Sequence, residues 1–197
     1  QLASVPDPRV QRFAPKLMRS LERAIDFCQS TLSYGRAQEA PPDRRMISVE
    51  PVVAEVRESA GLAADASIGW ISAIERGLAI DADPDQLFRV LLNLVRNAAQ
   101  ALESLPKGDA AALQIRITGR REGSVAIIEV SDTGPGVPAR AREHLFEAFQ
   151  TSGRPGGSGL GLAIAAELVR AHGGDIHLVE GTIGATFRIS IPDRPVE

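Results

Sequence analysis

The sequence predicts an α+β fold: a two-layer α/β sandwich in which helices cover one face of a sheet, preceded by a separate long helix. Three observations lead to this prediction. Apolar residues recur at helical spacing in several segments, β-rich runs alternate with those segments, and a charged, proline-containing stretch separates the first helix from the rest. The 197 residues, 44% of them hydrophobic, are enough for a sizeable core.

The first helix is expected between Pro8 and Gly35, where apolar residues recur every three or four positions. This stripe consists of Val10, Phe13, Leu17, Leu21, Ala24, Cys28 and Leu32. A second stripe of Ala14, Met18 and Ile25 widens the apolar face, which favours packing in a helical bundle. A helix that merely docks on its own domain is the alternative.

A domain boundary is expected in residues 36–45, which combine charge with the pair Pro41-Pro42. Two prolines end a helix and stiffen a connection. Residues 1–44 then form the helix and its linker, and residues 45–197 form the second domain.

The second domain is expected to alternate strands and helices. Strands are predicted at residues 46–49, 68–74, 78–80, 113–118, 125–130, 175–179 and 185–191. One helix is predicted to begin at Glu50-Pro51, a second at Asp83-Pro84, and a third covers about residues 159–171. The two strands that flank Glu122-Gly123 indicate a hairpin. We expect antiparallel strands, with the helices on one face of their sheet.

Composition excludes several classes of function. The formal net charge of -3 and the pI near 5.7 argue against a nucleic-acid binder. The single cysteine, Cys28, allows no internal disulfide and no multi-cysteine zinc site. No apolar run approaches the roughly 20 residues of a membrane span, and none resembles a signal peptide. These residues are therefore expected to be cytoplasmic and without membrane contact, although a parent protein could be membrane-anchored.

The glycine-rich segments raise the question of phosphate binding, but the commoner phosphate loops do not fit. A Walker loop needs Gly-Lys followed by Ser or Thr, whereas Lys16 and Lys107 each follow a proline. The glycines of residues 156–161 lack the spacing of a dinucleotide fingerprint, and Ser158 lacks the second glycine of a hydrolase elbow.

Two asparagines on the long second-domain helix form the first candidate site. Asn93 and Asn97 are four residues apart and therefore share a helix face. Amide oxygens suit a hard cation such as Mg²⁺, which also keeps waters and substrate phosphates as ligands. Ordinary solvent-facing polar residues would give the same pattern, so this alternative stays open.

The second candidate is Asp132-Thr133-Gly134-Pro135-Gly136, directly after a predicted strand. An aspartate at a strand end can accept a hydrogen bond from an exocyclic amine, and adjacent glycines let a flat base approach the backbone. A plain turn is the alternative.

The third candidate is the glycine-rich run from Gly156 to Gly161, which leads straight into a helix. Backbone N–H groups at a helix N-terminus form an anion site suited to phosphates. A flexible linker is the alternative, but a linker would not continue into the apolar stripe of Leu160, Ile164 and Leu168.

In this order, the three segments resemble the N, G1 and G2 boxes of bacterial sensor histidine kinases. Leu145-Phe146-Glu147-Ala148-Phe149 resembles the F box, and residues 181–187 resemble the final glycine box. The resemblance covers about residues 46–192, and its N box is most similar to the nitrogen- and oxygen-regulation type. The helix from Pro8 to Gly35 resembles the second helix of the dimerisation and histidine-phosphotransfer hairpin, which implies a homodimer.

The resemblance implies an ATP site of the GHKL superfamily. Asp132 would read the adenine amine, and Gly134 and Gly136 would border the base. Thr186 would support Asp132. Asn97 would hold Mg²⁺ on the triphosphate, with Asn93 beside the phosphates as the second catalytic residue.

The resemblance also implies a lid from Glu147 to Ser158 and a phosphate cradle behind it. The cradle would be the ATP-binding run Gly157, Ser158, Gly159, Leu160 and Gly161. Where lids of this family often offer a lysine, this chain has Arg154, which is the candidate phosphate contact.

The family transfers the ATP γ-phosphate to a histidine, which passes it to an aspartate of a response-regulator receiver domain. None of His144, His172 and His177 has the sequence context of that acceptor, so we expect the acceptor to be absent from this chain and His144 and His172 to be structural. Two alternatives remain: a GHKL-type ATPase clamp, whose relatives carry a glutamate base at the position of Asn93, and a degenerate, non-catalytic scaffold.

Overall fold

The computed structural model describes residues 41–62, 67–105, 113–149 and 159–195. The predicted N-terminal helix, and with it the expected dimer contact, lies outside the described residues. So do Arg154, Gly157 and Ser158.

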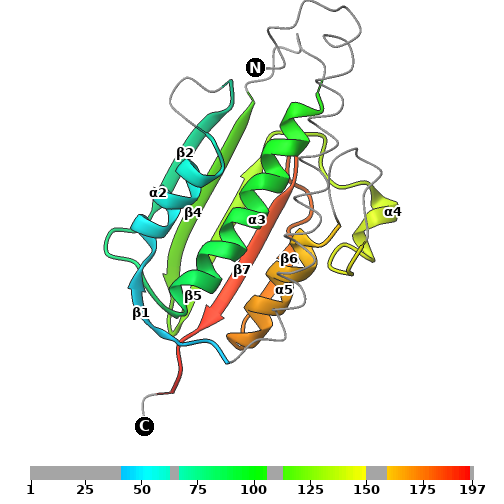
Figure 1. The fold of residues 1–197 in the computed structure, drawn as a ribbon. Helices are drawn as coiled ribbons and strands as arrows, with labels where there is room; N and C mark the ends of the chain where they lie inside the picture. The colour runs from blue at the N-terminus through cyan, green and yellow to red at the C-terminus, as the bar shows by residue number, and fades with distance from the viewer. Residues whose placement is uncertain (1–40, 63–66, 106–112, 150–158, 196–197) are drawn as a thin grey trace, which may run out of the picture.

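A five-stranded sheet forms one layer of the domain, in the order β2-β4-β5-β7-β6 (Figure 1). Its strands are β2 Gly69–Ile74, β4 Gln114–Glu122, β5 Val125–Asp132, β6 Asp175–Leu178 and β7 Thr186–Pro192. The predicted hairpin is confirmed, because β4 and β5 pair antiparallel across a turn in which Gly123 has φ +62°.

The expectation of antiparallel strands is wrong for β2, which pairs parallel with β4. Parallel neighbours need a long crossover connection. Here the chain between the two strands makes β3 (Ala79–Ala82) and α3 (Pro84–Glu103) before it returns. β3, which corresponds to the predicted strand at residues 78–80, is not part of the main sheet and pairs antiparallel with β1 (Arg45–Ser48).

Three helices form the second layer: α2 (Val49–Ser59), α3 and α5 (Gly161–Ala171). Figure 1 shows them on one face of the sheet, with α3 over its centre. Asp83 caps α3, because its side chain accepts hydrogen bonds from the backbone N–H groups of Asp85 and Gln86. A four-residue helix, α4 (Ala139–Arg142), was not predicted. None of the described helices is long and apolar enough to cross a membrane.

The core lies between the two layers. The buried face of α3 includes Leu87, Leu91, Leu94 and Leu102, which pack in one cluster with strand residues such as Ile115, Ile117, Ile128 and Ile189. Burying each such side chain stabilises the fold by roughly 1.5–3 kcal/mol. The helical and two-residue periodicities of these segments are therefore the main source of the fold.

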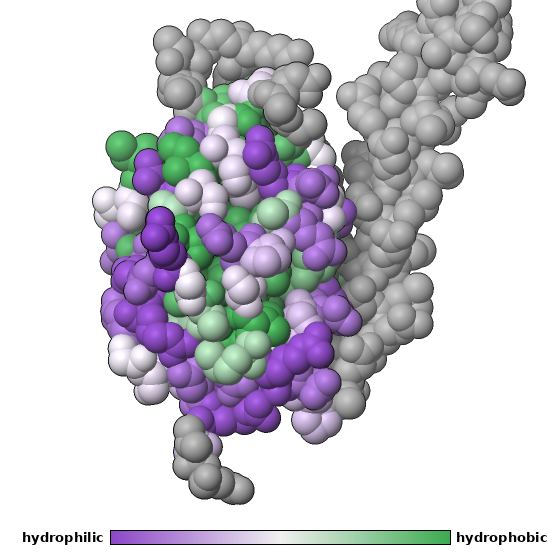
Figure 2. All heavy atoms as spheres, turned by 90° about the vertical axis from the view of Figure 1, so that its left-hand side faces the viewer, coloured by the Kyte–Doolittle hydropathy of each residue, from purple (hydrophilic) through white to green (hydrophobic). Residues whose placement is uncertain are grey.

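The other sheet face carries polar residues. Glu129 on β5 lies 2.7 Å from the Arg188 Nε on β7 and 3.5 Å from an Arg120 nitrogen on β4. The face seen in Figure 2, which carries α2, β1 and the β2 edge, mixes apolar and polar residues and is hydrophilic along its lower rim.

Candidate functional site

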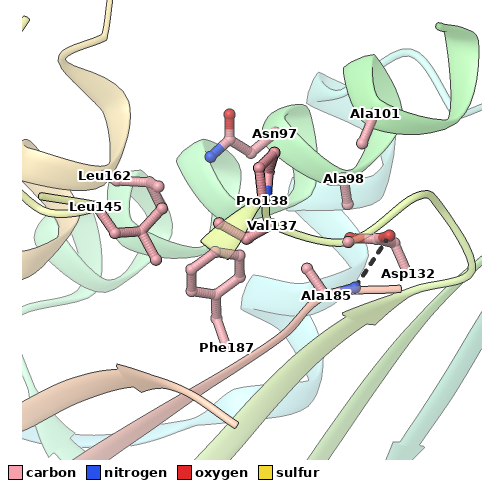
Figure 3. Close-up of a pocket in the computed structure, with 11 residues that line it drawn as sticks. Asn97, Ala98, Ala101, Asp132, Val137, Pro138, Leu145, Leu162, Ala185 and Phe187 are labelled. Carbon is pink, nitrogen blue, oxygen red and sulfur yellow. Dashed lines mark hydrogen bonds between the residues drawn. The ribbon is translucent and has the colours of Figure 1, made fainter. Parts of the chain in front are cut away.

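A pocket lies between α3, the carboxyl end of β5 and the start of β7. It is lined by Asn97, Ala98, Ala101, Asp132, Gly136, Val137, Pro138, Leu145, Leu162, Ala185 and Phe187. In Figure 3, Asp132 lies near Ala98, Ala101 and Ala185, whereas Asn97 projects from α3 toward Leu145 and Leu162. The pocket thus has a carboxylate at one side and an amide at the other.

Asp132 is held by the backbone around it. It is 6% exposed, and its Oδ1 accepts hydrogen bonds from the N–H groups of Gly134 (2.8 Å) and Ala185 (3.3 Å). The Asp132 N–H donates to the Ala185 carbonyl at 2.9 Å. These bonds fix the orientation of the carboxylate relative to the pocket.

Glycines allow the backbone beside Asp132 to pack closely. A Cβ at Gly134 would lie 2.7 Å from the Asp132 Oδ1, and one at Gly136, whose φ is +72°, would lie 2.9 Å from the Gly184 carbonyl oxygen. A Cβ at Gly184, also at φ +72°, would lie 1.9 Å from the Asp132 carbonyl oxygen. The structure therefore places Gly134 beside Asp132, and Gly136 beside Gly184, which in turn lies against Asp132. The sequence alone places Gly184 in the glycine box of residues 181–187 but gives it no role of its own.

Apolar side chains form much of the remaining wall. They are Val137, Pro138, Leu145, Leu162, Ala185 and Phe187. Behind them, the Phe146 and Phe187 rings meet edge to face with centroids 6.4 Å apart. Sequence reasoning did not assign these residues to the site, although Leu145 lies in the F-box segment and Ala185 and Phe187 lie in the final glycine box. The contacts that bring them into one wall join segments far apart in the chain and leave no local signal.

Asn97 and Asn93 share one side of α3, as predicted from their spacing. Asn97 is half-buried and lines the pocket. Asn93 lies against the start of α5, since a Cβ at Gly161 would be 3.4 Å from the Asn93 Oδ1. The N-cap residue of α5 is Leu160, whose apolar side chain makes no capping hydrogen bond. The partial positive charge of this helix end thus lies beside Asn93.

The remaining predicted residues that the structure describes lie around the same site. Thr186 is 6% exposed, and its hydroxyl donates to the Oγ of Ser131, the residue before Asp132, at 3.1 Å. Leu160 is buried at the N-cap of α5. The Gly159 carbonyl accepts a hydrogen bond from the Phe149 N–H at 3.0 Å.

The described residues contain no cluster of three or more His, Cys, Asp or Glu side chains that could hold a metal ion. The Asn97 amide that lines the pocket offers an oxygen of the kind that Mg²⁺ accepts together with substrate oxygens and water.

Two histidines have partners that agree with the predicted structural role. His172 is 1% exposed, and its ring lies between the Leu168 carbonyl (2.8 Å) and the Asp83 N–H (3.0 Å). Exposed His144 pairs with Glu147 at 2.8 Å, and this bond raises the pKa of His144.

With this geometry established, comparison with known proteins gives the family. Residues 82–195, more than half of the chain, match the family model described as histidine kinase-, DNA gyrase B-, and HSP90-like ATPase. The chain belongs to this family. The matched region contains the asparagines of α3, Asp132 and α5.

Similar curated proteins are sensory histidine kinase/phosphatases named NtrB. The protein from Rhizobium leguminosarum bv. phaseoli is 34% identical over 166 residues, which cover 79% of this chain and 43% of the relative. The one from Escherichia coli O157:H7 is 31% identical over 198 residues, covering 97% and 55%. The chain spans about half the length of these relatives.

Solved structures agree with the fold and with the kinase branch of the family. Full-length ShkA in complex with AMPPNP superposes with a TM-score of 0.73 at 27% identity, covering 97% of this chain and 40% of ShkA. The catalytic domain of the histidine kinase ThkA gives a TM-score of 0.65 at 25% identity, covering 76% of this chain and 95% of that domain. The GHKL-type catalytic fold inferred from the sequence is therefore confirmed for the described residues.

Proposed function

We propose that this chain is the ATP-binding catalytic part of a sensor histidine kinase. It would transfer the ATP γ-phosphate to a histidine outside these 197 residues, for relay to an aspartate of a response regulator. The observation that carries the proposal is the placement of Asp132 and Asn97 on opposite sides of one apolar pocket, in a chain of this ATPase family.

The Asp132 side of the pocket suits adenine. Its carboxylate is an acceptor, and adenine offers an amine donor on one edge, whereas guanine offers a carbonyl oxygen at the corresponding position. Apolar walls such as Val137 and Leu145 can pack against the faces of a base. We therefore assign the base to Asp132, with Gly134 and Gly136 along its edge and Thr186 as a supporting residue.

The Asn97 side of the pocket suits a magnesium triphosphate. Asn97 would ligate the metal, and Asn93 would lie beside the phosphates near the start of α5. When bound, Mg²⁺ neutralises charge that develops on the phosphate oxygens. The N–H groups that begin α5, around Leu160 and Gly161, supply further stabilisation of negative charge.

Phosphoryl transfer requires mainly that the protein positions the reacting groups and stabilises the negative charge on the phosphate oxygens. The residues of this site can do both. An ATPase clamp needs a base that activates water. The amide of Asn93 cannot accept a proton, so the ATPase clamp is a weaker hypothesis than the histidine kinase. A non-catalytic scaffold would not need the pocket.

The proposed partners are a response-regulator receiver domain and a second copy of the chain. Crystals of ThkA with the response regulator protein TrrA contain a kinase of the same fold, with a TM-score of 0.70 at 22% identity. Association through the apolar stripe of residues 10–32 would give the homodimer.

Calorimetric titration of the chain with ATP, GTP and inosine triphosphate in the presence of Mg²⁺ tests the nucleotide assignment. We expect micromolar binding of ATP and at least tenfold weaker binding of the other two, because both carry a carbonyl oxygen in place of the adenine amine that would donate to Asp132. Equal affinity for the three nucleotides, or no binding of ATP, would contradict the proposal.

A further inference from the structure

Arg44, the last linker residue before β1, joins the linker to three separate segments. Its Nε donates to the Asp81 carbonyl (3.1 Å), its Nη1 to the His172 carbonyl (2.7 Å) and its Nη2 to the Pro192 carbonyl. The side chain is only 11% exposed. A guanidinium can donate to all of these acceptors at once, because its five N–H groups point in different directions within one rigid plane. The ammonium group of a lysine lacks this planar arrangement of donors.

A buried carboxylate fixes this guanidinium. The Asp81 Oδ2 lies 3.3 Å from the Arg44 Nη2, and the Asp81 side chain is 7% exposed. Arg194 donates from its Nε and Nη2 to the same carboxylate, at 2.9 and 3.0 Å. Arg194 also donates to the Arg44 carbonyl at 2.6 Å, so the segment that follows β7 contacts the backbone of the linker as well.

The contact with His172 brings α5 into this cluster. His172 is the C-cap of α5, where the helix dipole is negative and a donated hydrogen bond from a cation is favourable. The His172 ring in turn accepts from the N–H of Asp83, the N-cap of α3. In Figure 1 the segment that leads into β1 passes the lower end of α5.

The opposite ends of these helices border the pocket. Leu162 in the first turn of α5 and Asn97 in the second half of α3 both line it, and Gly161 contacts Asn93. With 11 residues, α5 is about 16 Å long, so its C-cap beside Arg44 and its first turn at the pocket belong to one short, continuous helix.

We propose that Arg44 is a positioning residue that couples docking of the linker to nucleotide binding. The inference rests on the proposed function, since it needs a nucleotide in the pocket. A nucleotide that holds the start of α5 would stabilise the Arg44 contacts at its end. By thermodynamic linkage, the docked linker raises nucleotide affinity by the same factor. The linker leads to the predicted helix of residues 8–35, so the ATP site would respond to how that helix is placed.

Hydrogen–deuterium exchange of the chain, with and without saturating Mg-AMPPNP, tests the coupling in the unaltered protein. We expect the nucleotide to slow exchange in residues 43–49, because Arg44 holds this segment to Pro192, which pairs with Val125 at the end of β5 opposite Asp132. Unchanged exchange there, with AMPPNP bound and the pocket protected, would overturn the inference while leaving the proposed function intact. Failure to bind AMPPNP at all would instead remove the proposed function.

Variants then assign the coupling to Arg44. Arg44→Ala should weaken Mg-AMPPNP binding about fivefold, at the lower end of the usual range for coupled sites, and abolish the nucleotide-dependent protection of residues 43–49. Arg44→Lys keeps the charge without the fork and should behave like alanine. Arg45→Ala is the matched control, because Arg45 is the exposed neighbouring arginine, and it should bind as the wild type does. Should Arg44→Ala fail to fold, Arg44→Lys carries the test. Wild-type affinity and protection in folded Arg44 variants would overturn the inference.

Discussion

Asp132 has two tasks at the level of the single residue. Its Oδ1 accepts hydrogen bonds from the backbone of Gly134 and Ala185, which holds the local chain, while the side chain also lines the pocket. A substitution that preserves shape and the Oδ1 acceptor can separate these tasks.

Asp132→Asn is expected to leave the fold intact and to weaken ATP binding at least tenfold. With its Oδ1 still turned to the backbone donors, the new amide presents an N–H group to the adenine amine, so two donors face each other. Calorimetry and thermal unfolding measure the two effects. Asp85→Asn, an exposed change on α3, is the control. Undiminished affinity would show that Asp132 does not read the base.

His172 makes stability depend on pH. Burial lowers its pKa below the ordinary value near 6.5, an effect that the Leu168 carbonyl opposes and the Arg44 charge reinforces. The hydrogen bonds fit a neutral ring, in which Nδ1–H donates to Leu168 and Nε2 accepts from Asp83. As pH falls below about 6.5 the unfolded state binds this proton first, so stability is lost.

Urea denaturation between pH 7 and 5 should therefore show a smaller fall in stability for His172→Gln than for the wild type. His144→Gln is the opposite control, because the pKa of His144 is raised by Glu147 and protonation favours its folded form. If His172→Gln keeps the wild-type slope, the buried neutral ring is not the source of the pH dependence.

At the level of elements, the turn before β7 can pack closely on the end of β5 only because it contains a glycine. Gly184 has φ +72° and faces the Asp132 carbonyl, whereas Gly123 in the β4–β5 turn has φ +62° and open space around it. Both positions require a backbone with positive φ, but only at Gly184 would a side chain collide with neighbouring atoms.

Gly123→Ala should cost about 1 kcal/mol in free energy of unfolding, the strain of a side chain at positive φ. Gly184→Ala should cost at least about 2 kcal/mol more, because the backbone must move to admit the methyl group, and it should also weaken ATP binding. Denaturant titrations of both variants measure the difference. Equal costs would contradict the close packing of Gly184 on Asp132.

Elements with local signals were predictable from the sequence, and non-local contacts were not. The Asp83-Pro84 cap located the start of α3 to the residue, the long apolar stripe identified its buried face, and Gly123 located the hairpin. The parallel pairing of β2 was missed because it depends on a partner more than 40 residues away.

The same distinction applies to the site. Asn97 and Asp132 could be found from motif spacing, since helix periodicity and a strand end place them. The pocket wall at Phe187 and the Arg44 contacts could not, because they join segments far apart in the chain.

For the whole molecule, the apolar stripe of residues 10–32 predicts self-association, since a helix with so broad an apolar face needs a partner. Light scattering on the chain should give a dimer. Residues 41–197 alone should give a monomer, which tests whether the N-terminal segment is responsible. A monomer of the entire chain at micromolar concentration would contradict the bundle.

The central claim concerns phosphoryl transfer to histidine. The most direct measurement extends the chain upstream of Gln1 by one helix along its natural coding sequence and supplies γ-labelled ATP with Mg²⁺. We predict an acid-labile, base-stable label on the protein that disappears when an upstream histidine is replaced. Tight ATP binding with no such label, and ATP hydrolysis in its place, would contradict the account and favour the ATPase clamp.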